Sequence, residues 1–245
     1  MKKKQILLNL LLVLLIFLLG ICIYNIFKLY RDNNSTSKII RNIENKVVIP
    51  KIDPSDASII QQEDKLELEN DFSKLSKINS DTVAWITIEK TNINYPIVQT
   101  TTNSYYLNHS FDKSLNVNGW IFLNTLNAGD FSDKNTIVFG HNTNGSTMFS
   151  QLKGIYNGKY GNEIKIYIYL RDIVYRYDTF SVFLTDENDE NPLDKFIDYE
   201  KILEYQKQSK VKFNVSVNEN EDILTLSTCY NTTNQKVILM AKRLN

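Results

Sequence analysis

Cysteine and histidine are both scarce in this chain. Its 245 residues include only two cysteines and two histidines, too few to build a zinc site or another Cys/His metal centre. We therefore expect neither a bound metal nor a cofactor. The cysteines are Cys22, inside a long apolar run, and Cys229, at the end of the stretch TLSTC near the C-terminus.

An excess of charge of either sign is also missing. Lys plus Arg and Asp plus Glu number 28 each, and no basic block occurs beyond the first residues. Without a basic patch, nucleic acid is not an expected partner. Internal repeats and low-complexity segments are absent as well.

One long apolar run, residues 6–27, lies near the N-terminus. At 1.5 Å per residue, roughly 20 such residues span a hydrocarbon core of about 30 Å. Lys2, Lys3 and Lys4 precede the run, so the positive-inside rule predicts a single-pass protein of the cell membrane with a cytoplasmic N-terminus and an extracellular remainder. A cleaved signal peptide is the alternative, but the run is long for one and lacks a small-x-small cleavage site.

The chain divides into three expected regions. Residues 1–30 are the cytoplasmic tip and transmembrane signal anchor, and residues 31–60, polar and without a sustained period, form an extracellular stalk. Residues 61–245 are long enough for one domain with its own core.

This placement separates the two thiols. Cys22 lies in the membrane and Cys229 outside it, so they cannot form a disulfide bond with each other. An unpaired thiol in an exported protein indicates either a reactive nucleophile or a bridge to another chain. A buried, inert cysteine in the core is the alternative.

The domain is predicted to be mainly β. Apolar residues at helical spacing indicate a helix over 61–78, and two further helices are expected at 148–155 and 198–210, with a tight turn at 170–173. So many short strands favour a closed or nearly closed barrel with helices on its outside. The expected strands are 83–88, 95–98, 119–124, 135–140, 163–170, 173–184, 222–228 and 236–242.

A thiol acts as a nucleophile only as the thiolate, which needs a neighbouring base or cation. His141 follows the apolar strand TIVF and a glycine, at the kind of strand-to-loop junction where active-site residues lie. His109 lies in a short helix or turn among aromatic residues. We therefore favour His141 as the partner of Cys229.

The segments TLSTC (225–229) and GHN (140–142), together with the N-terminal anchor, resemble the sortases, the membrane-anchored transpeptidases of Gram-positive bacteria. INSDTVAWITI, NYPIVQT, NSYYLNHSF, GWIFLN and VFGHNTNGSTMFSQL are similar to the class B branch, as is the helix expected at 198–210. The resemblance covers about residues 70–245. It implies a closed β-barrel of about eight strands with peripheral helices, in which 61–245 is the catalytic domain.

The resemblance also implies a Cys–His–Arg site. Cys229 matches the nucleophile and His141 the histidine, but Lys236 occupies the arginine position at the start of the last strand. In an antiparallel hairpin Lys236 falls opposite Cys229, whereas Arg243 lies seven residues further on, roughly 23 Å away at about 3.3 Å per residue.

Lys236 is expected at an exposed strand end, and a plain surface charge is the alternative to a catalytic role. Should another cation serve the site, Arg171 or Arg176 is the next candidate.

Three further residues are candidate substrate contacts. The backbone N–H of Tyr230, just after the nucleophile, is placed to stabilise an oxyanion. Ser227 shares the strand face of Cys229 by the period-two rule. Asn103 lies in a stretch resembling the class B substrate groove, although an Asx-turn that opens a helix explains it equally well.

The implied reaction is a transpeptidation. A thiolate cleaves the sorting signal of a surface protein through a thioester, and an amine of a cell-wall precursor then receives the protein. A membrane-anchored cysteine protease, in which water replaces the amine, is the main alternative. A non-catalytic surface domain with an inert Cys229 is the second. A pilus-polymerising class C enzyme is disfavoured, because no Asp-Pro-aromatic lid precedes the domain.

Overall fold

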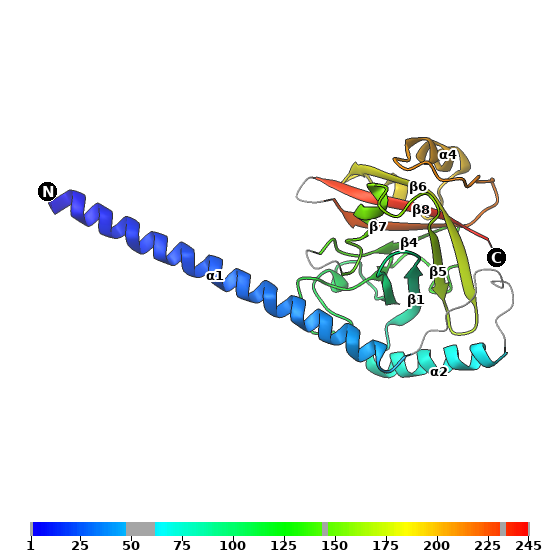
Figure 1. The fold of residues 1–245 in the computed structure, drawn as a ribbon, viewed down its shortest axis with the longest axis horizontal. Helices are drawn as coiled ribbons and strands as arrows, with labels where there is room; N and C mark the ends of the chain where they lie inside the picture. The colour runs from blue at the N-terminus through cyan, green and yellow to red at the C-terminus, as the bar shows by residue number, and fades with distance from the viewer. Residues whose placement is uncertain (1, 48–61, 144–146, 231–233, 245) are drawn as a thin grey trace.

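The computed structural model describes residues 2–47, 62–143, 147–230 and 234–244 (Figure 1). Four α-helices and two short 3₁₀ helices are present in this part of the chain: α1 (Lys2–Glu44), α2 (Gln62–Ile78), η1 (Tyr105–Leu107), α3 (Leu152–Tyr156), η2 (Asn191–Leu193) and α4 (Tyr199–Gln208). The strands are β1 (Thr82–Ile88), β2 (Asn94–Val98), β3 (Phe122–Leu123), β4 (Asn135–Phe139), β5 (Lys165–Tyr169), β6 (Val174–Asp186), β7 (Ile223–Cys229) and β8 (Gln235–Arg243).

The strands close into a barrel in the order β1-β2-β3-β4-β7-β8-β6-β5. The β2–β3 and β4–β7 pairs are parallel and the others antiparallel. Closure removes the free sheet edges at which strands of other chains would pair. The prediction of a closed barrel of about eight strands is therefore confirmed.

Strand β8 is buried on both of its faces. Val237 and Leu239 belong to the main core inside the barrel, whereas Ile238 and Met240 point to the outer face. There they join a second apolar cluster with Ile202 of α4. Because the η2–α4 segment covers this face, the strand reads in the sequence as a continuous apolar run instead of an alternating one.

The predicted helices are present, with one shorter than expected. Leu68, Phe72 and Leu75 of α2 are all fully buried, as their helical spacing predicts. The helix expected at 148–155 begins only at Leu152, because Met148 has a φ of 52° and so cannot continue a right-handed helix. The tight turn at 170–173 is closed by a hydrogen bond from Leu170 N to Ile173 O.

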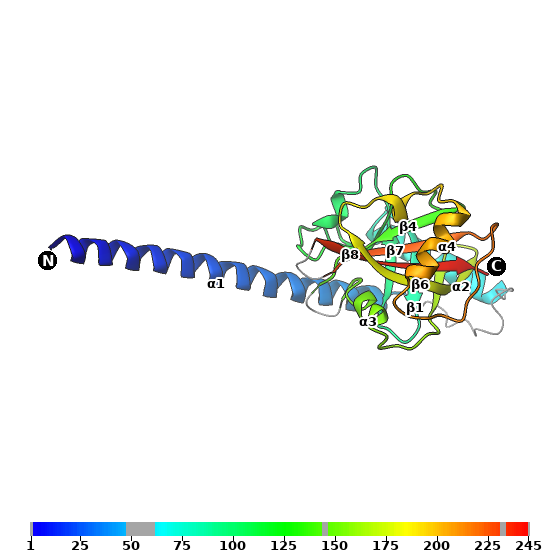
Figure 2. The ribbon, with the colours of Figure 1, turned by 90° about the horizontal axis from the view of Figure 1, so that it is seen from above.

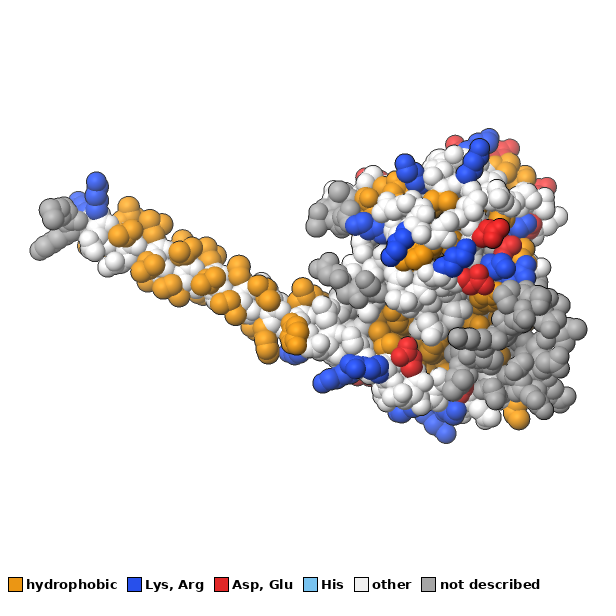
Figure 3. Space-filling model, in the orientation of Figure 1, with side chains coloured by type: hydrophobic (Ala, Val, Ile, Leu, Met, Phe, Trp, Pro, Cys, Tyr) orange, Lys and Arg blue, Asp and Glu red, His pale blue; other side chains and the backbone are white. Residues whose placement is uncertain are grey.

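The first helix is much longer than the apolar run. Side chains from Ile6 to Tyr30 are exposed and mostly apolar, and by length and composition the helix can cross a membrane (Figure 3). The first part of the expected stalk is helical although its sequence has no sustained period, because α1 continues to Glu44. Its last turns pack on the barrel, where Ile43 and, just beyond the helix, Val47 are buried. The rest of the expected stalk, from residue 48, lies outside the described residues.

Candidate active site

Strands β4 and β7 lead into His141 and Cys229, the two residues that the sequence predicts as partners. Their parallel register runs to Phe139↔Ser227, and Gly140 N donates to Ser227 O at 3.2 Å. His141 and Cys229 each lie two residues beyond this last pair, so the parallel direction of the two strands carries both of them towards the same end of the barrel. The carboxyl ends of two parallel strands thus bring a histidine and a cysteine to the same end of the barrel.

The thiol of Cys229 is free and exposed. Seen along β7, Ile223 lies in the outer cluster while Leu224 and Leu226 lie inside the barrel. The period of two therefore puts Cys229 on the outer face. An inert thiol buried in the core does not fit this position.

The imidazole of His141 is held by backbone groups. Its Nε2 lies 2.8 Å from Leu107 O. Since a carbonyl can only accept, Nε2 carries a proton, and Nδ1 is the ring nitrogen left for proton transfer. A carboxylate is not needed to fix this tautomer.

Gly119 makes room for the histidine. It has a φ of +56°, and a Cβ there would lie 2.3 Å from Tyr106 O and 2.8 Å from His141 Cδ2. Any larger residue would push on the ring and on the backbone of η1 at once. Gly119 is therefore a positioning residue for His141.

Tyr106 fixes η1, which carries the Leu107 carbonyl. Its hydroxyl donates to Asp81 Oδ2 at 2.8 Å and accepts from Asn79 Nδ2 at 2.7 Å. Burial raises the pKa of Tyr106 well above its usual value, so the hydroxyl keeps its proton and this link persists over the physiological range.

Lys236 lies on the other side of the thiol. It is the register partner of Cys229, as the hairpin geometry predicted, and directly opposite side chains share a face about 5 Å apart. The predicted exposure is wrong, because Lys236 is only 7% exposed. Its Nζ pairs with Glu190 Oε1 at 3.1 Å. The plain surface charge is excluded by the same burial.

Asp189 adds a second carboxylate near this lysine. Burial opposes its ionisation, but hydrogen bonds from Thr185 and Asn191 and the charge of Lys236 outweigh burial and lower the pKa of Asp189. The lysine is thus held by an acidic segment that leads into η2.

The arginines that the sequence offered lie elsewhere. Arg243 is bound to Asp222 and to Phe131 O at the far end of β8. Arg176 lies near that end, where its carbonyl accepts from Leu244 N, and Arg171 donates to Ser76 Oγ of α2. None of these contacts joins them to Cys229.

A different cation lies beside the residue that follows Cys229. Lys153 Nζ of α3 is 5.5 Å from the ring centroid of Tyr230, the residue that follows Cys229. No motif in the sequence links α3 to the final hairpin, so this neighbour was missed.

Two of the three expected substrate contacts, Tyr230 and Ser227, are engaged or buried in this conformation. The N–H of Tyr230 donates to Gln235 O at 2.7 Å within the hairpin, so in this conformation it is not offered to an oxyanion. Ser227 lies on the face of Cys229 as expected, but it is only 5% exposed.

Asn103 bridges two loops. Its Oδ1 accepts from Thr125 N at 2.9 Å and its Nδ2 donates to Asn124 Oδ1 at 3.2 Å. The Asx-turn is therefore wrong, because the amide reaches another loop instead of its own. No contact in the described part of the chain joins Asn103 to Cys229.

His109 has a structural environment. It stacks on Tyr105 with the ring centroids 4.0 Å apart, and its Nδ1 lies 2.8 Å from Tyr105 O. Among the described residues, no group of three or more His, Cys, Asp or Glu side chains is placed to hold a metal ion.

Comparison with known proteins gives a consistent result. A family model described as a sortase domain matches residues 86–244. Sortase B of Listeria monocytogenes is 34% identical over 170 residues, covering 66% of this chain and 68% of the relative. Sortase B of Staphylococcus aureus is 27% identical over 250 residues, covering 99% of this chain and 97% of the relative. The X-ray structure of Clostridium perfringens sortase B matches with a TM-score of 0.65 and 31% identity, over 71% of this chain and all of that one.

Proposed function

Since this chain belongs to the sortase family, in its class B branch, we propose that Cys229, His141 and Lys236 carry out its transpeptidation. The family activity is that of a cysteine transpeptidase which anchors surface proteins to the cell wall. One observation supports the residue assignment above all. The strand register pairs Cys229 with the cation Lys236 on β8, and the base His141 follows β4 at the end of the barrel where β7 ends in Cys229.

Cys229 supplies the nucleophile. As thiolate it attacks the carbonyl carbon of the scissile peptide bond in the sorting signal and forms a tetrahedral oxyanion. The C–N bond then breaks, leaving the acyl group on sulfur as a thioester. An amine of a cell-wall precursor attacks this thioester, the C–S bond breaks, and the thiolate is regenerated.

His141 moves the proton. As imidazolium it donates from Nδ1 to the departing amine, since Nε2 is engaged by Leu107 O. The neutral ring then accepts a proton at Nδ1 from the incoming amine. The same nitrogen thus serves both half-reactions.

Lys236 stabilises the oxyanion through its charge. An ammonium group lacks the planar fork of arginine and so offers a single point of attraction. Its pairing with Glu190 is weak, because the Glu190 side chain is 74% exposed. The developing oxyanion can therefore compete for the ammonium group.

The partners follow from the same reaction. Neighbouring structures include a Staphylococcus aureus sortase B–substrate complex and a sortase B complex with triglycine, which supports a sorting peptide and an amine as reactants. We further propose that α1 anchors the protein with its N-terminus in the cytoplasm and the barrel outside. The hydrolase and the non-catalytic domain are not favoured.

The test is Cys229→Ala. Removal of one sulfur from an exposed position should leave the fold intact, while both cleavage of a sorting peptide and its transfer to an amine are lost. Circular dichroism checks the fold, and chromatography of a labelled peptide with and without added amine measures both products. A Cys229→Ala protein that cleaves at the parent rate would refute the assignment.

A further inference from the structure

The loop between η1 and β3 is clamped to the first turn of α1 that contacts the barrel. Asn116 Nδ2 donates to Asp32 O at 3.1 Å and to Thr36 Oγ1 at 3.0 Å. Val117 N donates to Asp32 Oδ2 at 3.3 Å, and Asn118 Nδ2 donates to Thr36 Oγ1 at 3.1 Å. All four of the residues whose side chains form these bonds are buried: Asp32, Thr36, Asn116 and Asn118. The contact between the loop and α1 is therefore a buried network of satisfied hydrogen bonds.

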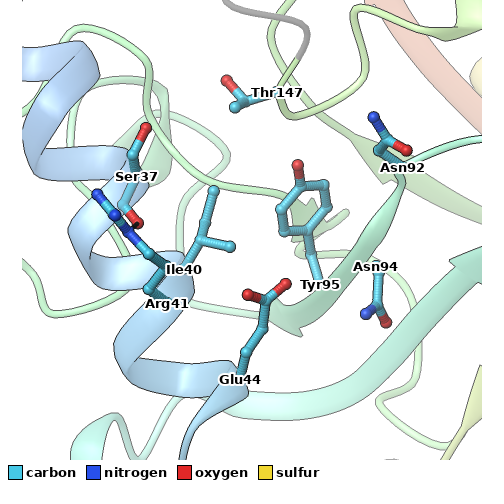
Figure 4. A pocket seen from close by; sticks show the side chains of 8 residues that line it. All are labelled: Ser37, Ile40, Arg41, Glu44, Asn92, Asn94, Tyr95 and Thr147. Carbon is cyan, nitrogen blue, oxygen red and sulfur yellow. Dashed lines mark hydrogen bonds between the residues drawn. The ribbon is translucent and has the colours of Figure 1, made fainter.

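Further contacts between α1 and the barrel lie towards the C-terminal end of the helix. Ile43 and Val47 are buried against the domain. Nearby, Glu44 faces Tyr95 of β2 across an open cleft of about 490 Å³ (Figure 4). Asp32, Thr36 and Ile43 contact the domain along one continuous helix, so α1 is a rigid connection with no hinge between the apolar run and the barrel.

The clamped loop lies close to the bilayer. Asp32 follows Phe27, the last residue of the apolar run, by five positions, a rise of about 7.5 Å at 1.5 Å per residue. The headgroup layer on each side of a hydrocarbon core is about 5–7.5 Å thick. The residues that contact Asp32 therefore lie at the outer boundary of that layer.

The tip of this loop presents apolar side chains to the outside. Leu115 is 74% exposed and Val117 is 43% exposed. Two basic residues of α1 lie just before Asp32, the residue that contacts this loop. Lys28 is exposed, and the Arg31 side chain is 63% exposed. Apolar tips beside basic residues suit the interface of a phospholipid bilayer.

We propose that Leu115 and Val117 dock on the headgroup layer of the membrane that α1 spans. The proposal rests on the anchoring of α1 proposed above. It has a consequence for the active site, because Gly119, two residues after Val117, seats His141. β7 ends and β8 begins on the side of the barrel from which α1 runs out (Figure 1 and Figure 2), so the reaction takes place at the membrane surface.

The test compares two tryptophans in the full chain reconstituted into phospholipid vesicles. Leu115→Trp reports on the proposed tip. Leu126→Trp is the matched control, because Leu126 is 70% exposed and lies at the opposite end of the barrel, where its carbonyl accepts from Lys195 Nζ. Trp85 and Trp120 are buried in both variants and give the same background.

Lipids brominated near the headgroup end of the acyl chain should quench the emission of Leu115→Trp and leave that of Leu126→Trp unchanged. Insertion of four alanines between Tyr30 and Arg31 raises the barrel by about 6 Å and should abolish the quenching. Protein that floats with the vesicles but shows no quenching at position 115 overturns the docking alone. Protein that does not float with them overturns the anchor as well. Quenching that persists after the insertion would show that α1 does not hold the loop at a fixed distance from the membrane.

Discussion

The two side chains proposed to act with Cys229, His141 and Lys236, are held in place by different kinds of interaction. On the β4 side, His141 is held by a backbone carbonyl and a glycine, with no charge involved. On the β8 side, Lys236 is held by the carboxylate of Glu190, an exposed side chain. The position of the histidine ring is thus set by backbone groups. The lysine ammonium is held by an ion pair with an exposed carboxylate, which water or a substrate can replace.

The largest expected effect is on the histidine side. His141→Ala removes the general acid and base and should lower kcat/KM by about 10²–10⁴-fold. His109→Ala, the matched control, should leave turnover near the parent value because its contacts are local to η1. Steady-state kinetics on a sorting peptide measures both variants. Loss of activity only in the His109 variant would reverse the assignment.

Lys236 should contribute less than the histidine. Lys236→Ala removes one oxyanion donor, which typically costs about 10²–10³-fold in rate. Burial of this side chain adds a stability cost, and a loss of about 1 kcal/mol lowers the melting temperature by about 2–4 °C. Lys236→Arg should keep or raise activity, since guanidinium supplies the charge with a second donor. An undiminished kcat/KM in Lys236→Ala would point to Lys153 as the next cation to test.

A substitution of Glu190 tests how the ion pair with Lys236 affects the rate. If its carboxylate competes with the oxyanion for Lys236, then Glu190→Gln should raise kcat/KM. An ion pair with one solvent-exposed partner contributes about 1 kcal/mol or less, so the rise is at most about fivefold. Glu200→Gln loses the same charge on α4 and should change nothing. A fall in the rate of the Glu190 variant would mean that the pair holds Lys236 in its working position.

The smallest effect concerns stability alone. The pKa of Asp189 is lowered in the folded protein, so its carboxylate stabilises the fold above its unfolded pKa of about 4. That contribution is lost as the pH falls through the folded value. Asp189→Asn should therefore reduce the difference in melting temperature between about pH 6 and about pH 3. Asp172→Asn, on the exposed β5–β6 turn, is the control, and an equal reduction in both variants would contradict this role.

The strands could be predicted from local patterns, and so could the strand-end positions of Cys229 and His141. All eight β-rich runs became strands, because β-branched and aromatic residues between turn residues act locally. Cys229 and His141 could be found from short motifs at strand ends. The opposition of Cys229 and Lys236 followed from hairpin geometry, and the observed register confirms it.

What could not be predicted depends on contacts between distant segments. Leu107 and His141 are 34 positions apart, and Glu190 and Lys236 are 46 apart. Nothing in either neighbourhood indicates such a pairing. The helical continuation past residue 31 was missed for the same reason, since polar residues there form hydrogen bonds with the η1–β3 loop.

The most direct measurement of the central claim is the mass of the enzyme after a single turnover. The parent protein is mixed with a panel of candidate sorting peptides without acceptor amine, quenched in acid, digested and analysed by mass spectrometry. We predict an acyl adduct on Cys229 that disappears when an amine is added, and much less adduct in the His141→Ala variant. An adduct on another residue, or peptide cleavage with no adduct on Cys229, would contradict the account.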